Sequence, residues 1–166
     1  MKNNYKFWNI VIIIKDDCIL MIDRNKGDFG GYVPPGGKVE FPETFSDSAI
    51  REVKEETGLD VLSLDLYGIS GYINEIKHEQ YIYLDFLCTK FEGELLEVGP
   101  EGNLKWIPIE SIEKIEITPH IKKRILNILE KKRYEYQVFW DENAHAAKGD
   151  YLFPWHIHFL SLCNEY

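Results

Sequence analysis

The sequence contains few cysteines, no long apolar run and fewer basic than acidic residues. Three cysteines in 166 residues are an odd number, which favours reduced core thiols in a cytoplasmic protein over a disulfide framework. The longest apolar run, residues 10–14, has the length of a strand and falls short of the roughly 18 residues of a membrane helix. The N-terminus lacks the pattern of a secretory signal, so we expect no membrane partner.

The shortage of basic residues limits the kinds of partner. A formal net charge of −9 argues against a nucleic acid polymer, because binding to one relies on lysine and arginine side chains that neutralise phosphates. A small phosphorylated ligand is compatible with this charge, since a bound cation can bridge protein carboxylates and phosphates. With 45% hydrophobic residues, the chain is expected to be globular and to bury a substantial core.

The apolar pattern predicts a mixture of strands and helices. Strands are expected at residues 5–15 and 18–24 as a hairpin, and at 38–41, 59–76, 79–91, 104–107 and 134–140, the last as an edge strand. Helices are expected at 44–57 and from 118 to about 132, with a short helix or turn at 111–116. Because the elements mix without regular βαβ units, the predicted class is α+β, an α/β/α sandwich with a mixed β-sheet between helices.

Composition divides the chain near residue 140. Residues 1–140 contain the predicted elements and form the expected main domain. Residues 141–150 are polar and loop-like, whereas residues 151–160 are apolar and aromatic. We therefore expect residues 141–166 to form a C-terminal extension that packs on the domain or against a second subunit, because an exposed apolar tail is a liability. The protein would then be a monomer or a homodimer.

The stretch 36–61 contains the densest group of candidate functional residues. A glycine pair precedes a predicted helix that carries Glu52, Glu55 and Glu56 and ends at Gly58. Residues three and four apart share a helix face, so these carboxylates are expected to converge, and their like charges repel unless a cation binds. Hard divalent cations prefer oxygen ligands, which favours Mg²⁺ or Mn²⁺. A solvated acidic face is the alternative for such a cluster on its own.

The spacing around this helix resembles the Nudix box, the signature of the Nudix hydrolase family. The box is a glycine, five residues, a glutamate, seven residues and then R-E-U-x-E-E-x-G-U, where U is bulky and aliphatic. Its defined positions are matched by Gly37, Glu43, Arg51, Glu52, Val53, Glu55, Glu56, Gly58 and Leu59. The resemblance extends from Tyr5 to about Trp140. It implies a Nudix-type fold and Mg²⁺-dependent hydrolysis of a nucleoside diphosphate linked to another group, with a small nucleotide as partner.

The resemblance also implies a role for each matched residue. The implied metal ligands are the Gly37 carbonyl and the carboxylates of Glu52, Glu55, Glu56 and Glu101. Arg51 and Glu43 would hold the loop against the helix and orient Glu52. Glu101, five residues before Trp106, stands where MutT-type members carry a later glutamate, and Glu97 is the competing choice. The proton acceptor in hydrolysis would be Glu52 or Glu101.

Several residues outside the box are candidates for substrate binding. Arg24 and Lys38 could contact phosphates, with a salt bridge and surface solubility as their alternative roles. The aromatic residues that could stack on a base, or simply pack in the core, are Phe29, Tyr32, Tyr72 and Tyr83. His156 and His158 alternate along the chain and could form a metal pair, but no further ligands stand at a defined spacing from them.

The overall layout is most similar to MutT-type members, which hydrolyse oxidised purine nucleoside triphosphates such as 8-oxo-dGTP. The predicted reaction releases a nucleoside monophosphate and pyrophosphate. Some eukaryotic relatives read the oxidised base with an asparagine two residues after the loop glycines, whereas this chain has Tyr32-Val33-Pro34-Pro35 there. Alternative substrates are therefore ADP-ribose, a dinucleoside polyphosphate or another nucleotide conjugate. A non-catalytic nucleotide-binding domain is a further alternative from a different functional class.

Overall fold

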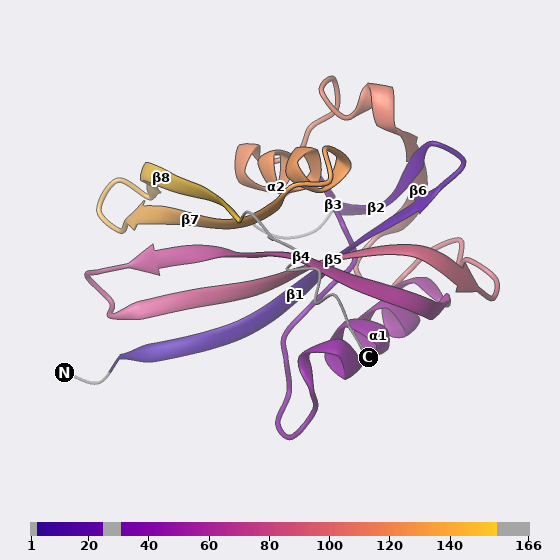
Figure 1. Cartoon of the computed structure of the whole chain (residues 1–166), viewed down its shortest axis with the longest axis horizontal. Helices are drawn as coiled ribbons and strands as arrows, with labels where there is room; N and C mark the ends of the chain where they lie inside the picture. Colours follow the sequence, from indigo (N-terminus) through magenta and orange to yellow (C-terminus); the bar gives the residue numbers. More distant parts are fainter. Residues whose placement is uncertain (1–2, 25–30, 156–166) are drawn as a thin grey trace, which may run out of the picture.

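The computed structural model describes residues 3–24 and 31–155, which form one β-sheet with a helix on each face (Figure 1). The strands are β1 (Asn4–Lys15), β2 (Cys18–Arg24), β3 (Gly31–Val33), β4 (Asp60–Asn74), β5 (Glu79–Glu92), β6 (Asn103–Pro108), β7 (Arg133–Asp141) and β8 (Ala146–Trp155). The helices are α1 (Phe45–Thr57), α2 (Pro119–Leu129) and the short 3-10 helix η1 (Ile109–Ser111). No helix in these two segments is long and apolar enough to cross a membrane.

The sheet is mixed and its order differs from the chain order. The strands follow the order β3-β2-β1-β5-β4-β7-β8, and β6 pairs with β2. The β1–β5 and β4–β7 pairs are parallel, whereas the hairpin pairs are antiparallel. Helix α1 lies below the sheet in Figure 1 and α2 above it. This arrangement confirms the predicted α+β class with a mixed sheet between helices.

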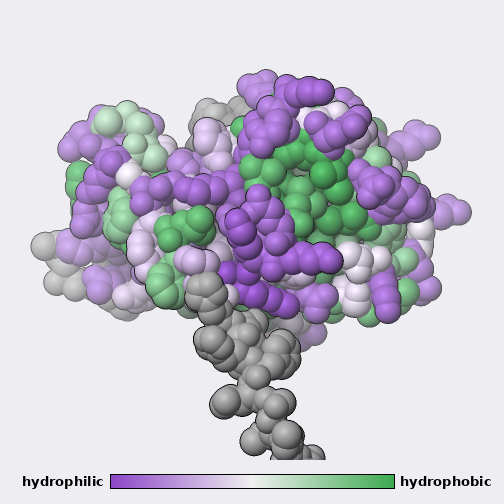
Figure 2. Space-filling model, turned by 45° about the horizontal axis from the view of Figure 1, so that its top comes forward, coloured by the Kyte–Doolittle hydropathy of each residue, from purple (hydrophilic) through white to green (hydrophobic). Residues whose placement is uncertain are grey.

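Alternation along β1 builds both halves of the core. Ile10 and Ile12 pack in the cluster that includes α2, whereas Val11 and Ile13 pack in the cluster that includes α1. Successive side chains of a strand point to opposite faces, so the apolar run in this strand reflects burial on both sides. The surface seen from the top side of Figure 1 is mostly hydrophilic, and its hydrophobic residues gather chiefly in one area (Figure 2).

Local signals explain why helix α1 begins and ends where it does, and they confirm the prediction for residues 44–57. The Thr44 hydroxyl caps the helix by accepting a hydrogen bond of 3.1 Å from the Asp47 N–H. Gly58 ends it in the left-handed region, at a φ of 80°, and donates its N–H to the Lys54 carbonyl.

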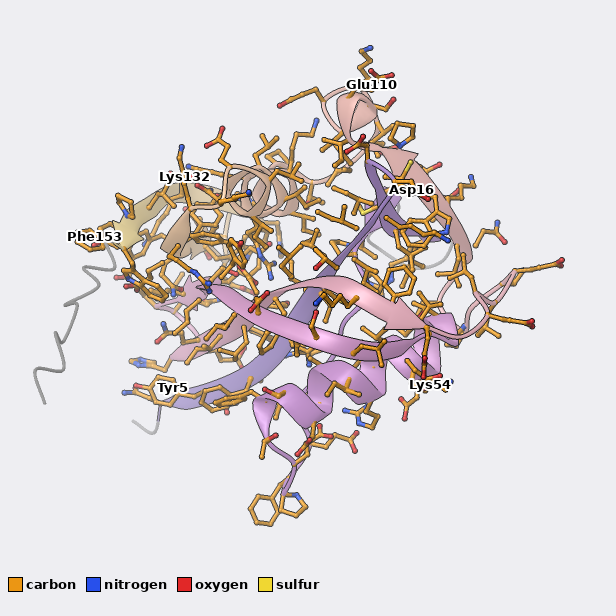
Figure 3. The ribbon with its side chains drawn as sticks, turned by 45° about the vertical axis from the view of Figure 1, so that its right-hand side comes forward. Tyr5, Asp16, Lys54, Glu110, Lys132 and Phe153 are labelled. Atoms are coloured by element: carbon orange, nitrogen blue, oxygen red, sulfur yellow. The ribbon has the colours of Figure 1, made fainter. Side chains whose placement is uncertain are left out.

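The predicted hairpin of β1 and β2 is also confirmed, but it is short. Asp16 and Asp17 form the turn with φ angles of 48° and 57°, and Figure 3 shows Asp16 at its tip. Only two residue pairs join the strands before they diverge. The remaining length of β2 pairs with β3 and β6, so the loop that follows β3 has access to the free edge of β1.

The predicted strand at 38–41 is wrong. Only Lys38 forms an isolated bridge, with Trp8, although the Asn9 N–H donates to the Gly37 carbonyl at 2.8 Å. The Lys38 carbonyl accepts a hydrogen bond of 3.1 Å from the Arg51 side chain. The Val39 N–H also donates to the Phe7 carbonyl at 3.0 Å. The segment therefore contacts β1 through a few hydrogen bonds, while the Lys38 carbonyl ties it to α1.

The C-terminal part departs from the prediction in two respects. Strand β7 is not an edge strand, because it lies between β4 and β8. Residues 146–150, expected in a loop, begin β8, whose outward side chains include Phe153 (Figure 3). Residues 146–154 are all exposed, so the sequence shows no alternation of buried and exposed residues here. Strand β8 is instead defined by its backbone pairing with β7. The division at residue 140 stays a prediction, and His156 and His158 lie outside the described residues.

The second helical region agrees with the prediction at its start and is shorter at its end. Helix α2 begins at Pro119 and ends at Leu129, because Lys131 adopts a left-handed φ of 56° that a right-handed helix cannot contain. The region 111–116 contains the end of η1 and a turn. Cys18 and Cys88 carry free thiols.

A buried polar network joins α2 to the sheet. The Asp85 carboxylate on β5 is fully buried and pairs with the Arg124 guanidinium of α2, whose Nε donates at 3.1 Å and 3.2 Å. Asp85 also accepts hydrogen bonds from the hydroxyls of Tyr134 at 2.7 Å and Ser70 at 3.0 Å. These two residues lie on β7 and β4, so one carboxylate connects three strands and a helix.

We predict that Asp85→Ala lowers the free energy of unfolding by about 3–5 kcal/mol, because it leaves a buried guanidinium without its counter-charge. Asp60→Ala is the matched control, since Asp60 is half-exposed and its ion pair with Lys54 lies at the surface. The control is expected to change the free energy by at most about 1 kcal/mol. Urea denaturation measures both, and equal effects would contradict the structural role of the network.

Candidate active site

The glycine loop before α1 passes unusually close to its neighbours. Gly36 has a φ of 151°, and a Cβ there would lie 2.3 Å from the Asn9 carbonyl oxygen. A Cβ on Gly37 would meet the Glu52 carboxylate at 2.3–2.5 Å. The backbone contact at Gly36 excludes a larger residue, whereas a Cβ at Gly37 would force the Glu52 side chain to move. The two glycines therefore let the backbone lie between strand β1 and the acidic face of α1.

Arg51 connects this loop to the helix. Its guanidinium donates to both oxygens of Glu43, at 2.8 Å and 3.0 Å, which is the strong bidentate geometry. Its Nη1 donates to Glu52 at 2.9 Å and to Glu55 at 3.2 Å. The Arg51 hydrogen bonds, together with the Glu40 N–H, lower the pKa of Glu43 to about 2. Arg51 thus connects Glu43 to Glu52 and Glu55 through hydrogen bonds.

The three helix glutamates differ strongly in environment. Glu56 is 4% exposed and accepts a hydrogen bond of 2.9 Å from the Gly36 N–H, and burial raises its pKa to about 8. Burial also raises the pKa of Glu52. Glu55 is more exposed and turns toward Arg51. In the part of the chain that the structure describes, no three acidic, histidine or cysteine side chains converge on one point.

The donor atoms of this region nevertheless fit a hard divalent cation. Glu56 is buried and Glu52 is partly buried, and desolvation disfavours the ionised form of each. A nearby cation would remove that penalty. The Gly37 carbonyl already accepts the Asn9 N–H, but a carbonyl oxygen has a second lone pair. Oxygen donors of this kind suit Mg²⁺ or Mn²⁺. The residues that would hold the ion are Gly37, Glu52, Glu55, Glu56 and Glu101.

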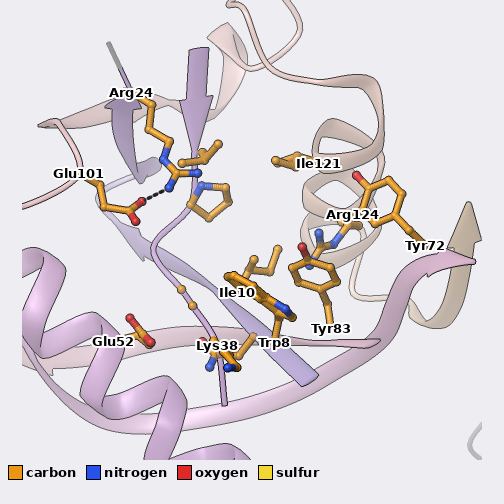
Figure 4. A pocket seen from close by; sticks show the side chains of 15 residues that line it. Trp8, Ile10, Arg24, Lys38, Glu52, Tyr72, Tyr83, Glu101, Ile121 and Arg124 are labelled. Atoms are coloured by element: carbon orange, nitrogen blue, oxygen red, sulfur yellow. Dashed lines mark ion pairs between the residues drawn. The ribbon is translucent and has the colours of Figure 1, made fainter. Parts of the chain in front are cut away.

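A cavity of about 260 Å³ extends from this acidic region across the α2 face of the sheet (Figure 4). Glu52 lies at one end with the ion pair between Arg24 and Glu101, whose charged atoms are 2.5 Å apart. Tyr72 and Tyr83 lie at the other end, with ring centroids 6.2 Å apart. The volume is below the roughly 300–1,000 Å³ of a typical ligand pocket, so it would enclose part of a ligand and leave the rest at the acidic opening.

The cavity brings together most of the proposed substrate-binding residues. Arg24, Lys38, Tyr72, Tyr83 and Glu101 all line it. Glu97 is exposed and is not among the described residues that line the cavity, which favours Glu101 as the later glutamate.

Two proposed aromatic residues are not placed in the cavity. The Tyr32 side chain packs against the α2 core cluster, and the Lys105 amine donates to its hydroxyl at 3.2 Å. Tyr32 does not belong to the described lining residues, because its ring covers the core beside β2. Phe29 lies outside the described residues.

Several lining residues were not predicted from the sequence, and three of them have large side chains at or near the aromatic end. They are Trp8 on β1 and Ile121 and Arg124 on α2. Arg124 stands on the apolar stripe of its helix, three residues after Ile121, and Asp85 interrupts an aromatic strand in the same way. A charge on a buried face is a usable signal, because it requires a partner. Trp8 reaches the other cavity residues only because β1 pairs with β5. The residues next to Trp8 in the sequence therefore do not indicate this contact.

Comparison with known proteins identifies the family. The profile of the NUDIX domain matches residues 7–128, which is most of the chain and includes the loop, α1 and the cavity. The chain belongs to the Nudix hydrolase family. Members of this family act on pyrophosphate bonds in nucleoside diphosphate derivatives.

Individual relatives agree with this assignment. The Nudix hydrolase YvcI of Bacillus subtilis is 29% identical over 111 residues, covering 65% of this chain and 69% of the relative. The ADP-ribose pyrophosphatase of Methanocaldococcus jannaschii is 38% identical over 105 residues, covering 63% of this chain and 62% of the relative. The crystal structure of the mutator MutT protein from Bacillus halodurans superimposes with a TM-score of 0.78 at 24% identity, covering 89% and 97% of the two chains. The last comparison establishes a shared fold.

The raised pKa of Glu56 predicts how stability depends on pH in metal-free buffer. A carboxyl whose pKa rises from 4.5 to about 8 on folding stabilises the fold below the lower value, and this contribution is lost as the pH rises through 8. Between pH 6 and pH 8 the Tm of the wild type should fall relative to that of Glu56→Gln, by about 2–4 °C per pH unit. Added Mg²⁺ should reduce the difference. Parallel Tm curves for the two proteins would contradict the burial of a proton at this site.

Proposed function

We propose that this protein is a Mg²⁺-dependent pyrophosphohydrolase that converts a nucleoside triphosphate into a monophosphate and pyrophosphate. The main support is that a single cavity joins an acidic end, which includes a glutamate of the Nudix box, to an aromatic end. Glu52 lines the first end, and Tyr72 and Tyr83 line the second. A ligand with a base and a phosphate chain could contact both ends at once.

The residues of this chain divide the chemical work. Bound Mg²⁺ would neutralise the phosphate oxygens and make water a stronger acid. Arg24 and Lys38 line the cavity and would hold phosphates by charge. An attacking water oxygen bonds to phosphorus as the bridging P–O bond breaks, and pyrophosphate leaves. The water proton passes to Glu52 or Glu101, both of which line the cavity. Positioning and charge neutralisation are the main requirements of phosphoryl transfer.

Two substrate classes have specific support. The resemblance to MutT-type sequences favours a purine nucleoside triphosphate, including oxidised forms such as 8-oxo-dGTP. The relative with 38% identity is an ADP-ribose pyrophosphatase, which favours ADP-ribose as the second candidate. Both substrates contain a pyrophosphate bond, so the proposed chemistry is the same for each.

A substrate panel with Mg²⁺ tests this proposal. We expect the highest kcat/KM for nucleoside triphosphates, including 8-oxo-dGTP, with lower values for ADP-ribose and dinucleoside polyphosphates. Glu56→Gln should lower kcat/KM for every substrate by roughly 100-fold or more, because even residues that only support metal ligands cost about 10–100-fold when lost. Glu55→Gln is expected to act in the same direction.

Glu110→Gln is the matched control, because Glu110 is exposed on η1 and lies outside the cavity lining. It should retain wild-type rates. Unchanged turnover of every substrate by Glu56→Gln would overturn the site assignment. Nucleotide binding without hydrolysis at high Mg²⁺ would instead support a non-catalytic role and overturn the proposed reaction. A higher kcat/KM for ADP-ribose would favour the second candidate.

A further inference from the structure

The ion pair between Arg24 and Glu101 joins two residues that are expected to bind different ligands. Glu101 is a candidate metal ligand, whereas Arg24 would hold a phosphate. Their charged atoms are 2.5 Å apart, and Figure 4 shows the pair at the same end of the cavity as Glu52. A guanidinium at this distance neutralises the carboxylate and repels a metal ion that approaches it. While the pair is intact, Glu101 is therefore a poor metal ligand.

The charges of this pair act on the glutamates of the Nudix box. Burial is the main cause of the raised pKa of Glu56, the charge of Glu101 raises it further, and the charge of Arg24 opposes the shift. Burial also raises the pKa of Glu52, and the charge of Glu101 adds to this effect. The pair thus lies within electrostatic reach of carboxylates that would hold the metal ion, and Arg24 is the cation that balances Glu101 there.

The loop that carries Glu101 is held tightly in place. A Cβ on Gly102 would lie 2.2 Å from the Asp23 carbonyl oxygen, and one on Gly99 would lie 2.4 Å from the Glu56 carbonyl oxygen. The Gly99 N–H also donates to the Gly102 carbonyl at 2.9 Å. The loop therefore fits closely between β2 and α1, so Glu101 leaves its partner by rotation of its side chain and not by movement of the loop.

The ion pair costs little to separate. The side chains of Arg24 and Glu101 are each 36% exposed, and exposed ion pairs contribute little to stability because water screens them. The buried pair of Asp85 and Arg124 is different, since its side chains are 0% and 4% exposed and its separation would be costly. A phosphate offers the Arg24 guanidinium a bidentate partner, so a nucleotide in the cavity would draw it away from Glu101.

We propose that Arg24 is a positioning residue that acts through Glu101 and couples cation binding to nucleotide binding. Arg24 neutralises Glu101 until the phosphates of a nucleotide attract the guanidinium, and Glu101 is then free to bind the divalent cation. This rests on the proposed function, since it uses the phosphate ligand and the cation of the same site. Removal of the Arg24 charge should therefore change two affinities in opposite directions, with tighter binding of the cation alone and weaker binding of the nucleotide. A loss of folding would weaken both.

Titration of the full chain with Mn²⁺ in nucleotide-free buffer measures the first effect, with free Mn²⁺ followed by electron paramagnetic resonance. Arg24→Gln should lower the Kd for Mn²⁺ relative to the wild type. The same substitution is then made in a Glu101→Gln background, where no carboxylate remains to be released. The fall in Kd should be roughly 2- to 5-fold larger with Glu101 present than without it, which is the scale of an exposed ion pair. Equal falls in the two backgrounds would reveal a general effect of charge and overturn the inference.

Lys105→Gln is the matched control. Lys105 pairs with Asp23, the residue before Arg24 on β2, with charged atoms 2.7 Å apart, and it lies outside the described lining of the cavity. The Kd for Mn²⁺ of this variant should stay within about twofold of the wild-type value, and a fall as large as that of Arg24→Gln would contradict the inference. Circular dichroism establishes that each variant is folded, and Arg24→Met replaces Arg24→Gln if the latter is not.

Steady-state kinetics at saturating Mg²⁺ measure the second effect. Arg24→Gln should raise KM for the best nucleoside triphosphate about tenfold or more, because a hydrogen bond between charged groups is lost, with a smaller change in kcat. An unchanged KM would overturn the inference, since Arg24 would then hold no phosphate. Hydrolysis together with equal falls in the Mn²⁺ Kd would overturn the inference alone. The expected Mn²⁺ results without hydrolysis of any nucleotide would support the release of Glu101 and overturn only the proposed reaction.

Discussion

The geometry of the site depends on the ion pairs and hydrogen bonds made by the Arg51 guanidinium. It neutralises part of a helix face where carboxylates would otherwise repel one another, and it joins Glu43 to Glu52. It also binds the Lys38 carbonyl, which ties the loop to α1. Without this charge, the helix would lose its electrostatic balance and one of its connections to the loop, the other being the bond from the Gly36 N–H to Glu56. The close approach of Gly37 to Glu52 is possible because the loop is held in this way.

Burial of an ionised acidic side chain opposes stability unless a counter-charge accompanies it. Glu56 is enclosed by the loop and α1, and desolvation raises its pKa, so the ionised form costs free energy that the rest of the fold must supply. A divalent cation would offset that cost. The buried pair of Asp85 and Arg124 is different, because each charge there has its partner within the chain. Glu56 would therefore gain from a bound cation, whereas the charges of Asp85 and Arg124 already neutralise each other within the chain.

The parts of the structure that local interactions determine could be predicted from the sequence. Helix α1 has its cap at Thr44 and its end at Gly58, and the box spacing placed Glu52 and Glu56 beside the glycine loop. Strand β8 could not be predicted, because its exposed residues carry no burial pattern and its position depends on pairing with β7. Trp8 was missed for a related reason. Its partner Tyr83 is 75 positions away in the chain and becomes adjacent only through the parallel pairing of β1 with β5.

Strand β1 supports the glycine loop and also contributes to the aromatic end of the cavity. Its backbone at Asn9 binds the glycine loop, whereas the side chain of Trp8 points to the α2 side and lines the cavity. Glu52 at the acidic end of the cavity belongs to α1, whereas Arg24 and Glu101 come from β2 and from the loop before β6. The aromatic end is formed by the central strands and α2. A substitution on α2 at the aromatic end therefore lies away from the carboxylates of α1. This separation requires that β1 stay fixed, which its burial on both faces ensures.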